Sequence, residues 1–209
     1  MRLSAQINGP PRQFVVTEMA DPLNLDPSQT ALVLIDLQKG ILSRHTAPHS
    51  ASDVLARGVR LANAFRKAGA VVVLVHVAFS PDGGDVLKQP TDAGPMPAAP
   101  DPDWYVISPD LGRGANDIVI TKRQWGAFYG TQLDMQLRRR GIKTIVIGGI
   151  ATNFGVESTA RDAYERGYAL VLVEDAMAGL SDSAHGFAIS NIFPRLGRVR
   201  STEEVLKAL

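Results

Sequence analysis

One segment near the middle of the chain, residues 144–168, constrains the fold most, because it joins an apolar β-branched run to an amphipathic helix through a short loop. The run 144–147 is followed by two glycines and is typical of a strand buried on both faces. Asn153 predicts a helix N-cap and Gly167 predicts the helix end. Such a loop directs backbone N–H groups toward a negative charge, so we expect an anionic or oxyanion-forming group there, unless it is an ordinary strand-to-helix connection.

The same alternation of strand and helix runs through the rest of the chain. Short apolar runs predict buried strands, and amphipathic stretches between them predict helices. Asp53 is expected to cap the first helix, Pro194 to end the helix 181–192, and a capping box, Ser201 with Glu204, to start the last one. The predicted strands are residues 31–36, 70–77, 117–121, 144–147, 169–173 and 198–200. This pattern predicts a three-layer α/β/α domain with a doubly wound, six-stranded parallel sheet in the order 3-2-1-4-5-6.

Two segments lack such periodicity. Residues 1–28 are expected to form an N-terminal arm that covers a neighbouring subunit, which leaves 29–209 as one domain. Residues 81–116 are rich in proline and glycine. A structureless stretch of that length inside a compact domain is usually functional, so we expect a lid or a subunit-contact segment.

Composition excludes several classes of function. A formal net charge of +1 argues against a dedicated nucleic-acid or membrane-surface binder, and the basic run 138–140 reads as the solvated end of a helix. No apolar stretch approaches the ~20 residues that span a bilayer, and the N-terminus has no apolar signal-peptide core, so a cytoplasmic protein is expected. The chain contains no cysteine, which excludes disulfides, thiolate metal sites and thiol nucleophiles.

Two charged residues follow predicted strands at the edge where ligands bind in such folds. Asp36 ends the first strand and would face the loop 151–155 across the topological switch point. Lys122 follows the third strand, about two strand spacings (~10 Å) away, a gap that a lysine side chain can largely cover. Burial should raise the pKa of Asp36 and Lys122 should lower it, as suits a general acid–base group. The alternative is an aspartate that only caps a helix or pairs with a cation.

Three segments carry a family resemblance: LVLIDLQKG, KRQWGAFYGT and GIATNFGVESTARDAYERGY. In this order they resemble the motifs of the isochorismatase-like hydrolases over roughly residues 30–175. The resemblance implies Asp36 as the acid–base residue, Lys122 as its catalytic partner, and a non-proline cis peptide at Ile150–Ala151 that turns N–H groups into the site. The position of the family's cysteine nucleophile corresponds to Gly155. Substrate contacts are expected from Gln38, Trp125, Phe128, Tyr129, Asn153 and Phe154, although the three aromatic residues at 125–129 could instead serve packing.

Glycine at position 155 closes the covalent route by which most of the family cleaves amides. Isochorismatases themselves also carry glycine there, and they cleave a vinyl ether by protonating it from the aspartate, after which water attacks. They have a tyrosine where this chain has Ala151, and a glutamine after the second strand where this chain reads HVAF. We therefore expect a hydrolase of a small metabolite with Asp36 as general acid or base and water as the attacking group, on a vinyl ether, amide or ester. The alternative is a catalytically lapsed relative that binds a small molecule or serves assembly.

No metal or other cofactor is expected. Nicotinamidase relatives bind zinc through an Asp-x-His pair and a later histidine, whereas His45, His49 and His76 of this chain form no such pair. The hydroxyls of Thr152, Ser158 and Thr159 are expected to serve capping or packing. The expected partners are a small-molecule substrate and further copies of the chain in a dimer or tetramer, with no nucleic acid and no membrane.

Overall fold

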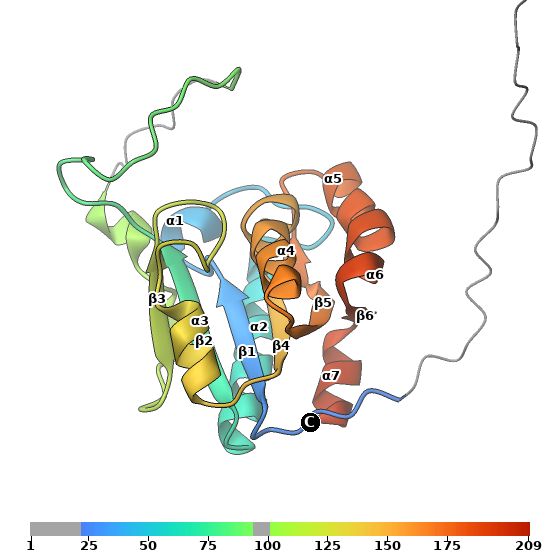
Figure 1. Ribbon diagram of the computed structural model, residues 1–209. Coiled ribbons are helices and arrows are strands. Elements are labelled where there is room, and N and C mark those ends of the chain that lie inside the picture. Colours follow the sequence, from blue (N-terminus) through green and yellow to red (C-terminus); the bar gives the residue numbers. More distant parts are fainter. Residues whose placement is uncertain (1–21, 94–100) are drawn as a thin grey trace, which may run out of the picture.

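The computed structural model describes residues 22–93 and 101–209, so most of the predicted arm lies outside the described residues. Six parallel strands form one sheet in the order β3-β2-β1-β4-β5-β6, as predicted (Figure 1). The strands are β1 (Thr30–Ile35), β2 (Val71–Val77), β3 (Ile118–Lys122), β4 (Thr144–Ile150), β5 (Ala169–Ala178) and β6 (Arg198–Arg200). The helices are α1 (Lys39–Leu42), α2 (Ala51–Lys67), α3 (Leu133–Arg139), α4 (Glu157–Glu165), α5 (Asp182–Phe187), α6 (Phe193–Leu196) and α7 (Thr202–Ala208).

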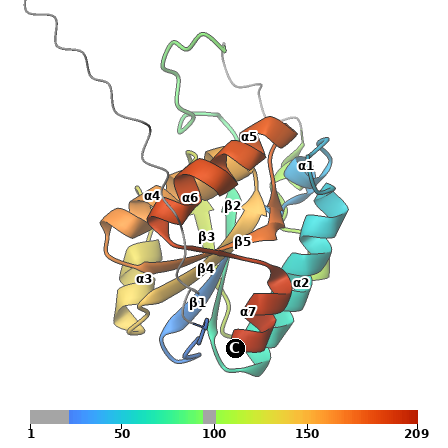
Figure 2. The ribbon, with the colours of Figure 1, turned by 90° about the vertical axis from the view of Figure 1, so that its right-hand side faces the viewer.

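Helices cover both faces of the sheet, which accounts for the continuous apolar character of its strands. One core lies between the sheet and α3, α4 and α6, and it includes Leu133, Ala160 and Phe193. The other lies between the sheet and α2 and α7, with Phe65 and Val205 among its members. Figure 2 shows α2 and α7 on one side of the sheet and α3, α4 and α6 on the other. None of the described helices is long and apolar enough to cross a membrane.

Two predicted helix caps are wrong. Ser50, not Asp53, caps α2, because its hydroxyl accepts from the Asp53 backbone N–H at 3.1 Å while Asp53 lies inside the first turn. Asn153 is not an N-cap either. The chain turns into a π-helical segment at Thr152–Val156, Ala151 occupies the cap position, and no side chain caps the turn.

The predicted ends of one strand and one helix are also wrong. β5 does not stop before its acidic residues but continues to Ala178, with a register shift against β4. The strand tolerates Asp175 because this carboxylate accepts from the N–H and hydroxyl of Thr202 and pairs with Arg57. Pro194 does not end the last long helical stretch. It lies in the first turn of α6, where its missing N–H costs no hydrogen bond.

Part of the segment 81–116 is ordered against the body of the domain. Two short 3₁₀ turns form at Pro102–Tyr105 and Pro109–Leu111. Ile107 forms a β-bridge with Gln38, and Leu111 is buried. The prediction of a structureless stretch is therefore wrong for these residues, and residues 94–100 lie outside the described part. Figure 1 shows the preceding stretch, up to residue 93, extending away from the body.

Gly149 sets how closely β4 approaches β1. Its φ is +125°, and a Cβ there would lie 2.6 Å from the backbone nitrogen of Ile35. Only glycine allows both the conformation and the contact. The end of β1, and with it Asp36, is therefore held directly against the loop that follows β4.

Candidate active site

Asp36 follows the last residue of β1 in a conformation that L-residues rarely adopt. Its φ is +54°, and it is the one non-glycine residue with positive φ in the described ranges. Its backbone N–H donates to Val75 of β2, and its side chain is buried. Such outliers persist where the surrounding structure holds them and are frequent at functional sites.

Lys122 lies across β2 from Asp36, as the strand order predicts. It is the last residue of β3, in register with Val77 of β2, and it is 2% exposed. Its Nζ donates to Asp36 Oδ2 at 2.8 Å. The expected approach of the two charges is therefore present, as a fully desolvated ion pair.

The hydrogen bonds of the pair are divided unequally between its two members. Lys122 Nζ also donates to the backbone oxygens of Gln124 at 3.2 Å and Trp125 at 2.9 Å, so its three hydrogens all have acceptors. By contrast, Asp36 Oδ1 is buried and has no hydrogen-bond partner among the described residues. Burial raises the pKa of Asp36 and outweighs the Lys122 charge, which lowers it. One carboxyl oxygen is thus fixed and the other is left for a reacting group.

Gly155 lies directly beside Asp36 and Lys122. A Cβ at position 155 would lie 3.2 Å from Asp36 Oδ2, 3.4 Å from Lys122 Nζ and 3.1 Å from Ile35 Cγ2. Its φ is not in the left-handed region, so the constraint on this glycine is the space beside the ion pair and not its backbone conformation. The structure therefore brings together the three positions that the sequence singled out as catalytic.

The turn that carries Gly155 is fixed at both ends. The Ile150–Ala151 peptide bond is cis, as the resemblance implied. The Ala151 carbonyl then accepts from the N–H groups of Phe154 and Val156. At the far end the Thr159 hydroxyl donates to the Gly155 carbonyl at 2.6 Å and accepts from a backbone N–H of the 123–132 loop. This hydroxyl serves packing of the turn, in line with its predicted role.

The aromatic candidates divide into two groups. Trp125 and Phe154 form an edge-to-face pair at 4.9 Å, Trp125 is about half exposed, and Tyr129 is largely exposed. These three remain candidates for substrate contact. Phe128 is instead buried in the core, where it packs on Tyr168. The prediction of Phe128 as a substrate contact is corrected, because its ring has no surface to offer.

Gln38 is completely buried and its amide is held by backbone groups. The side chain donates to the carbonyls of Val77 and Trp104 and accepts from the Val77 N–H. It therefore joins the end of β1 to β2 and to the ordered part of the 81–116 segment. Asn153, in contrast, has a buried side-chain oxygen without a partner in the described ranges and remains available to a ligand.

A cavity of about 490 Å³ lies on the opposite face of the sheet from the ion pair. Its lining includes Leu74, His76 and Val119, which alternate with the residues that face Lys122 along β2 and β3. His76 is held there by Tyr105 O and the Thr121 hydroxyl. We therefore separate this cavity from the Asp36 site.

A second cluster was missed by the sequence analysis. His185, on α5, donates to or accepts from the Thr152 hydroxyl at 2.9 Å and lies beside His49 and Glu174. Glu174 directly follows the predicted strand 169–173, and His185 has no motif partner nearby in sequence. A histidine inside a predicted polar helix was the only signal available.

The doubly wound fold places a buried acid–lysine pair at the carboxyl edge of the sheet, where ligands bind in folds of this class. Comparison with known proteins agrees. The Isochorismatase domain family matches residues 30–204, so this chain belongs to the isochorismatase family of hydrolases.

Relatives match over nearly the whole chain. The isochorismatase family protein YecD of Escherichia coli O157:H7 is 53% identical over 90% of this chain and 100% of its own length. The ureidoacrylate amidohydrolase RutB of Variovorax paradoxus (strain S110) is 30% identical over 97% of this chain and 90% of its own. A solved isochorismatase family protein from Burkholderia thailandensis superposes with a TM-score of 0.86 at 51% identity, covering 90% of this chain and 98% of that one.

Proposed function

We propose that this protein hydrolyses a small metabolite with Asp36 as its general acid or base and with water, not a side chain, as the attacking group. The observation that carries the proposal is the geometry at Gly155. The position that bears the nucleophile in most of the family has no side chain here, yet a Cβ at this position would lie 3.2 Å from Asp36 Oδ2 and 3.4 Å from Lys122 Nζ. With no cysteine anywhere in the chain, no other thiol can replace it.

Lys122 acts through Asp36 in this scheme. Its three N–H bonds are already used, so it has none left to donate to a substrate. It holds Oδ2, keeps the carboxyl in place and moderates the rise in its pKa. Asp36 Oδ1 is then the atom that exchanges a proton with the reacting group, as the orphaned buried oxygen supports.

Cleavage of a vinyl ether fits this arrangement without any nucleophile. A protonated Asp36 transfers its proton to the terminal carbon of the double bond, which leaves an oxocarbenium ion. Water adds to that cation and loses a proton to the Asp36 carboxylate, and the hemiketal collapses to a ketone and an alcohol. The raised pKa of Asp36 favours the protonated form that the first step needs.

Cleavage of an amide or ester is the second candidate, and the amidohydrolase relative favours it. In this case an ionised Asp36 takes a proton from water as the water attacks the carbonyl carbon. The carbonyl oxygen becomes negative and would be stabilised by N–H groups of the turn, with Ala151 and Gly155 as the proposed donors. When this intermediate collapses, the C–N or C–O bond breaks and Asp36 returns its proton to the leaving nitrogen or oxygen, so that a carboxylic acid and an amine or alcohol are released. Asn153, Trp125, Phe154 and Tyr129 are the proposed substrate contacts around it.

The experiment is a two-substrate assay on the purified protein. Isochorismate tests the vinyl ether route by pyruvate release, and ureidoacrylate tests the amide route by ammonia release. Asp36→Asn should lower turnover by about 10²–10⁴-fold. Asp26→Asn, which changes an exposed carboxylate just before β1, should leave turnover unchanged. A protein that binds one of these compounds equally well with and without the Asp36 carboxylate, and turns over neither, would support the lapsed, binding function instead.

We also propose that the protein is a cytoplasmic homo-oligomer. Exposed apolar side chains, including Phe187 at 60% and Leu180 at 42% exposure, support subunit contact near α5. Light scattering on the eluting protein tests this directly, since a mass near 22.4 kDa would indicate a monomer.

A further inference from the structure

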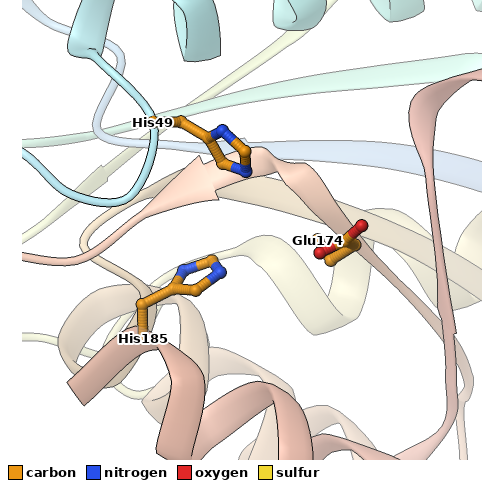
Figure 3. A group of neighbouring side chains, drawn as sticks. All are labelled: His49, Glu174 and His185. Atoms are coloured by element: carbon orange, nitrogen blue, oxygen red, sulfur yellow. The ribbon is translucent and has the colours of Figure 1, made fainter. Parts of the chain in front are cut away.

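Three side chains that no catalytic step uses meet near Thr152, at the start of the turn 150–156. They are His49, in the loop between α1 and α2, Glu174 on β5 and His185 on α5. Figure 3 shows the two imidazole rings and the carboxylate turned toward a common space. One ligand atom from each lies within 4.8 Å of the other two.

We propose that His49, Glu174 and His185 bind a divalent transition-metal ion of the zinc type. Two imidazoles and one carboxylate are a donor set that proteins use for zinc, and three protein ligands leave a position for water. Donor atoms of a tetrahedral site with bonds of ~2.0–2.1 Å lie ~3.3 Å apart. Binding therefore requires the half-buried His49 and Glu174 side chains to move their ligand atoms closer together.

The hydrogen bonds around the cluster support a ligand role for each member. His185 Nδ1 contacts the Thr152 hydroxyl at 2.9 Å, which leaves Nε2 as the nitrogen available to an ion. A partner on the second ring nitrogen is the usual way in which a metal-binding histidine is oriented. The side chains of His49 and Glu174 make no hydrogen bond or ion pair with any described residue, so nothing competes for them.

The backbone around the cluster is already fixed. Ala47 and Gly179 exchange two backbone hydrogen bonds, at 3.0 and 2.8 Å, which tie the loop before α2 to the end of β5. Thr46 donates to the His49 carbonyl at 2.8 Å and holds the histidine's place in that loop.

This site differs from the metal site expected of nicotinamidase relatives, since it contains no Asp-x-His pair and only one of the three ligands, His49, was weighed from the sequence. It is also independent of the proposed reaction. Its link to the active site is Thr152, which directly follows the cis peptide. A bound ion would hold His185 in place. Because His185 contacts the Thr152 hydroxyl, the ion would also restrict the start of the turn that carries Gly155.

The test is a binding titration of the full chain after chelator treatment, with Zn²⁺ as ligand, and with Co²⁺ as an optical reporter of tetrahedral N/O ligation. The wild-type protein should bind one ion per chain. His49→Gln and Glu174→Gln should each weaken binding at least 100-fold, and Thr152→Val about 10–100-fold, since it removes an outer partner. His45→Gln, an exposed histidine in the same loop as His49, is the matched control and should leave affinity unchanged.

A second measurement separates lost ligands from lost structure. Zn²⁺ should raise the thermal midpoint of the wild-type and His45→Gln proteins but not that of the His49→Gln/Glu174→Gln double variant. The midpoints without metal should agree among the three proteins, because the side chains of His49 and Glu174 make no hydrogen bond or ion pair within residues 22–93 and 101–209. Zn²⁺ binding of equal affinity and stoichiometry in the wild type and the double variant would overturn the proposal, as would the absence of binding to the wild type.

Discussion

Replacing Lys122 by methionine removes the counter-charge of Asp36 at nearly constant side-chain length. Both groups are buried, and the variant removes the positive charge of Lys122 and its hydrogen bond to Asp36 Oδ2. Breaking a buried ion pair from one side costs about 3–5 kcal/mol. The loss has a ceiling, because Asp36 can take up a proton instead. At pH 8 this costs about 5.6 kcal/mol, from ~1.4 kcal/mol per unit over the ~4 units above its unfolded pKa.

The stability lost in Lys122→Met should depend on pH. Burial raises the pKa of Asp36 in the folded protein, and loss of Lys122 removes the charge that opposes this rise. Between the unfolded and folded pKa values the folded state then holds one more proton, so stability falls as pH rises. The deficit of Lys122→Met should therefore be about 3–5 kcal/mol at pH 8 and shrink by up to about 1.4 kcal/mol per unit as pH falls toward 5.

Urea unfolding at pH 5 and pH 8, followed by circular dichroism, measures both numbers. The double variant Asp36→Asn/Lys122→Met has no titrating group at the pair and should lose this extra pH dependence. Lys39→Met breaks the exposed pair with Asp103 and should change stability by no more than about 1 kcal/mol at either pH. A Lys122→Met deficit that is below 1 kcal/mol, or the same at both pH values, would refute the argument that the pair is a desolvated one.

Three further predictions concern the site and the strand beside it. Asp36→Asn should lower kcat by about 10²–10⁴-fold on any substrate that the protein hydrolyses, and its circular dichroism spectrum should stay unchanged. A kcat within tenfold of the wild type would contradict an acid–base role. Gly155→Cys introduces the only thiol of the chain beside the Lys122 ammonium, which stabilises the thiolate. The pKa of its iodoacetamide alkylation should therefore be lower than that of Gly155→Cys/Lys122→Met, and equal values in the two variants would count against the proximity of position 155 to Lys122. Gly149→Ala should destabilise the protein by more than about 3 kcal/mol in urea unfolding, because its Cβ would collide with the β1 backbone. The control Gly186→Ala lies in open space on α5 and should increase stability by less than about 1 kcal/mol. Similar urea midpoints for the two variants would show that β4 can move away from β1.

The strand order was predictable because its strands are unbroken apolar runs separated by helices, and few topologies satisfy that pattern. The order in turn predicted the meeting of Asp36 with Lys122 from residues 86 positions apart. The helix-capping residues were harder to predict. Ser50 and Asp53 are both good cap residues, and which of them caps α2 depends on the path of the preceding loop.

Features set by distant partners were not predictable. The extension of β5 past its acidic residues depends on Thr202 and Arg57, which supply Asp175 with hydrogen bonds and an opposite charge. Phe128 carries the same aromatic signal as its neighbours, and only the packing of Tyr168 shows that it belongs to the core. The meeting of His49 and His185 likewise depends on how one loop and one helix approach β5, and no motif marks it.

The most direct test of nucleophile-free hydrolysis combines turnover with intact mass. The protein is mixed with isochorismate or with ureidoacrylate, product release is followed, and the protein is weighed by mass spectrometry during the reaction. We expect product from one of the two substrates, at least 100-fold less from Asp36→Asn, and no covalent adduct at any time. A covalent adduct on the wild-type chain, or undiminished product release by Asp36→Asn, would contradict water attack assisted by Asp36.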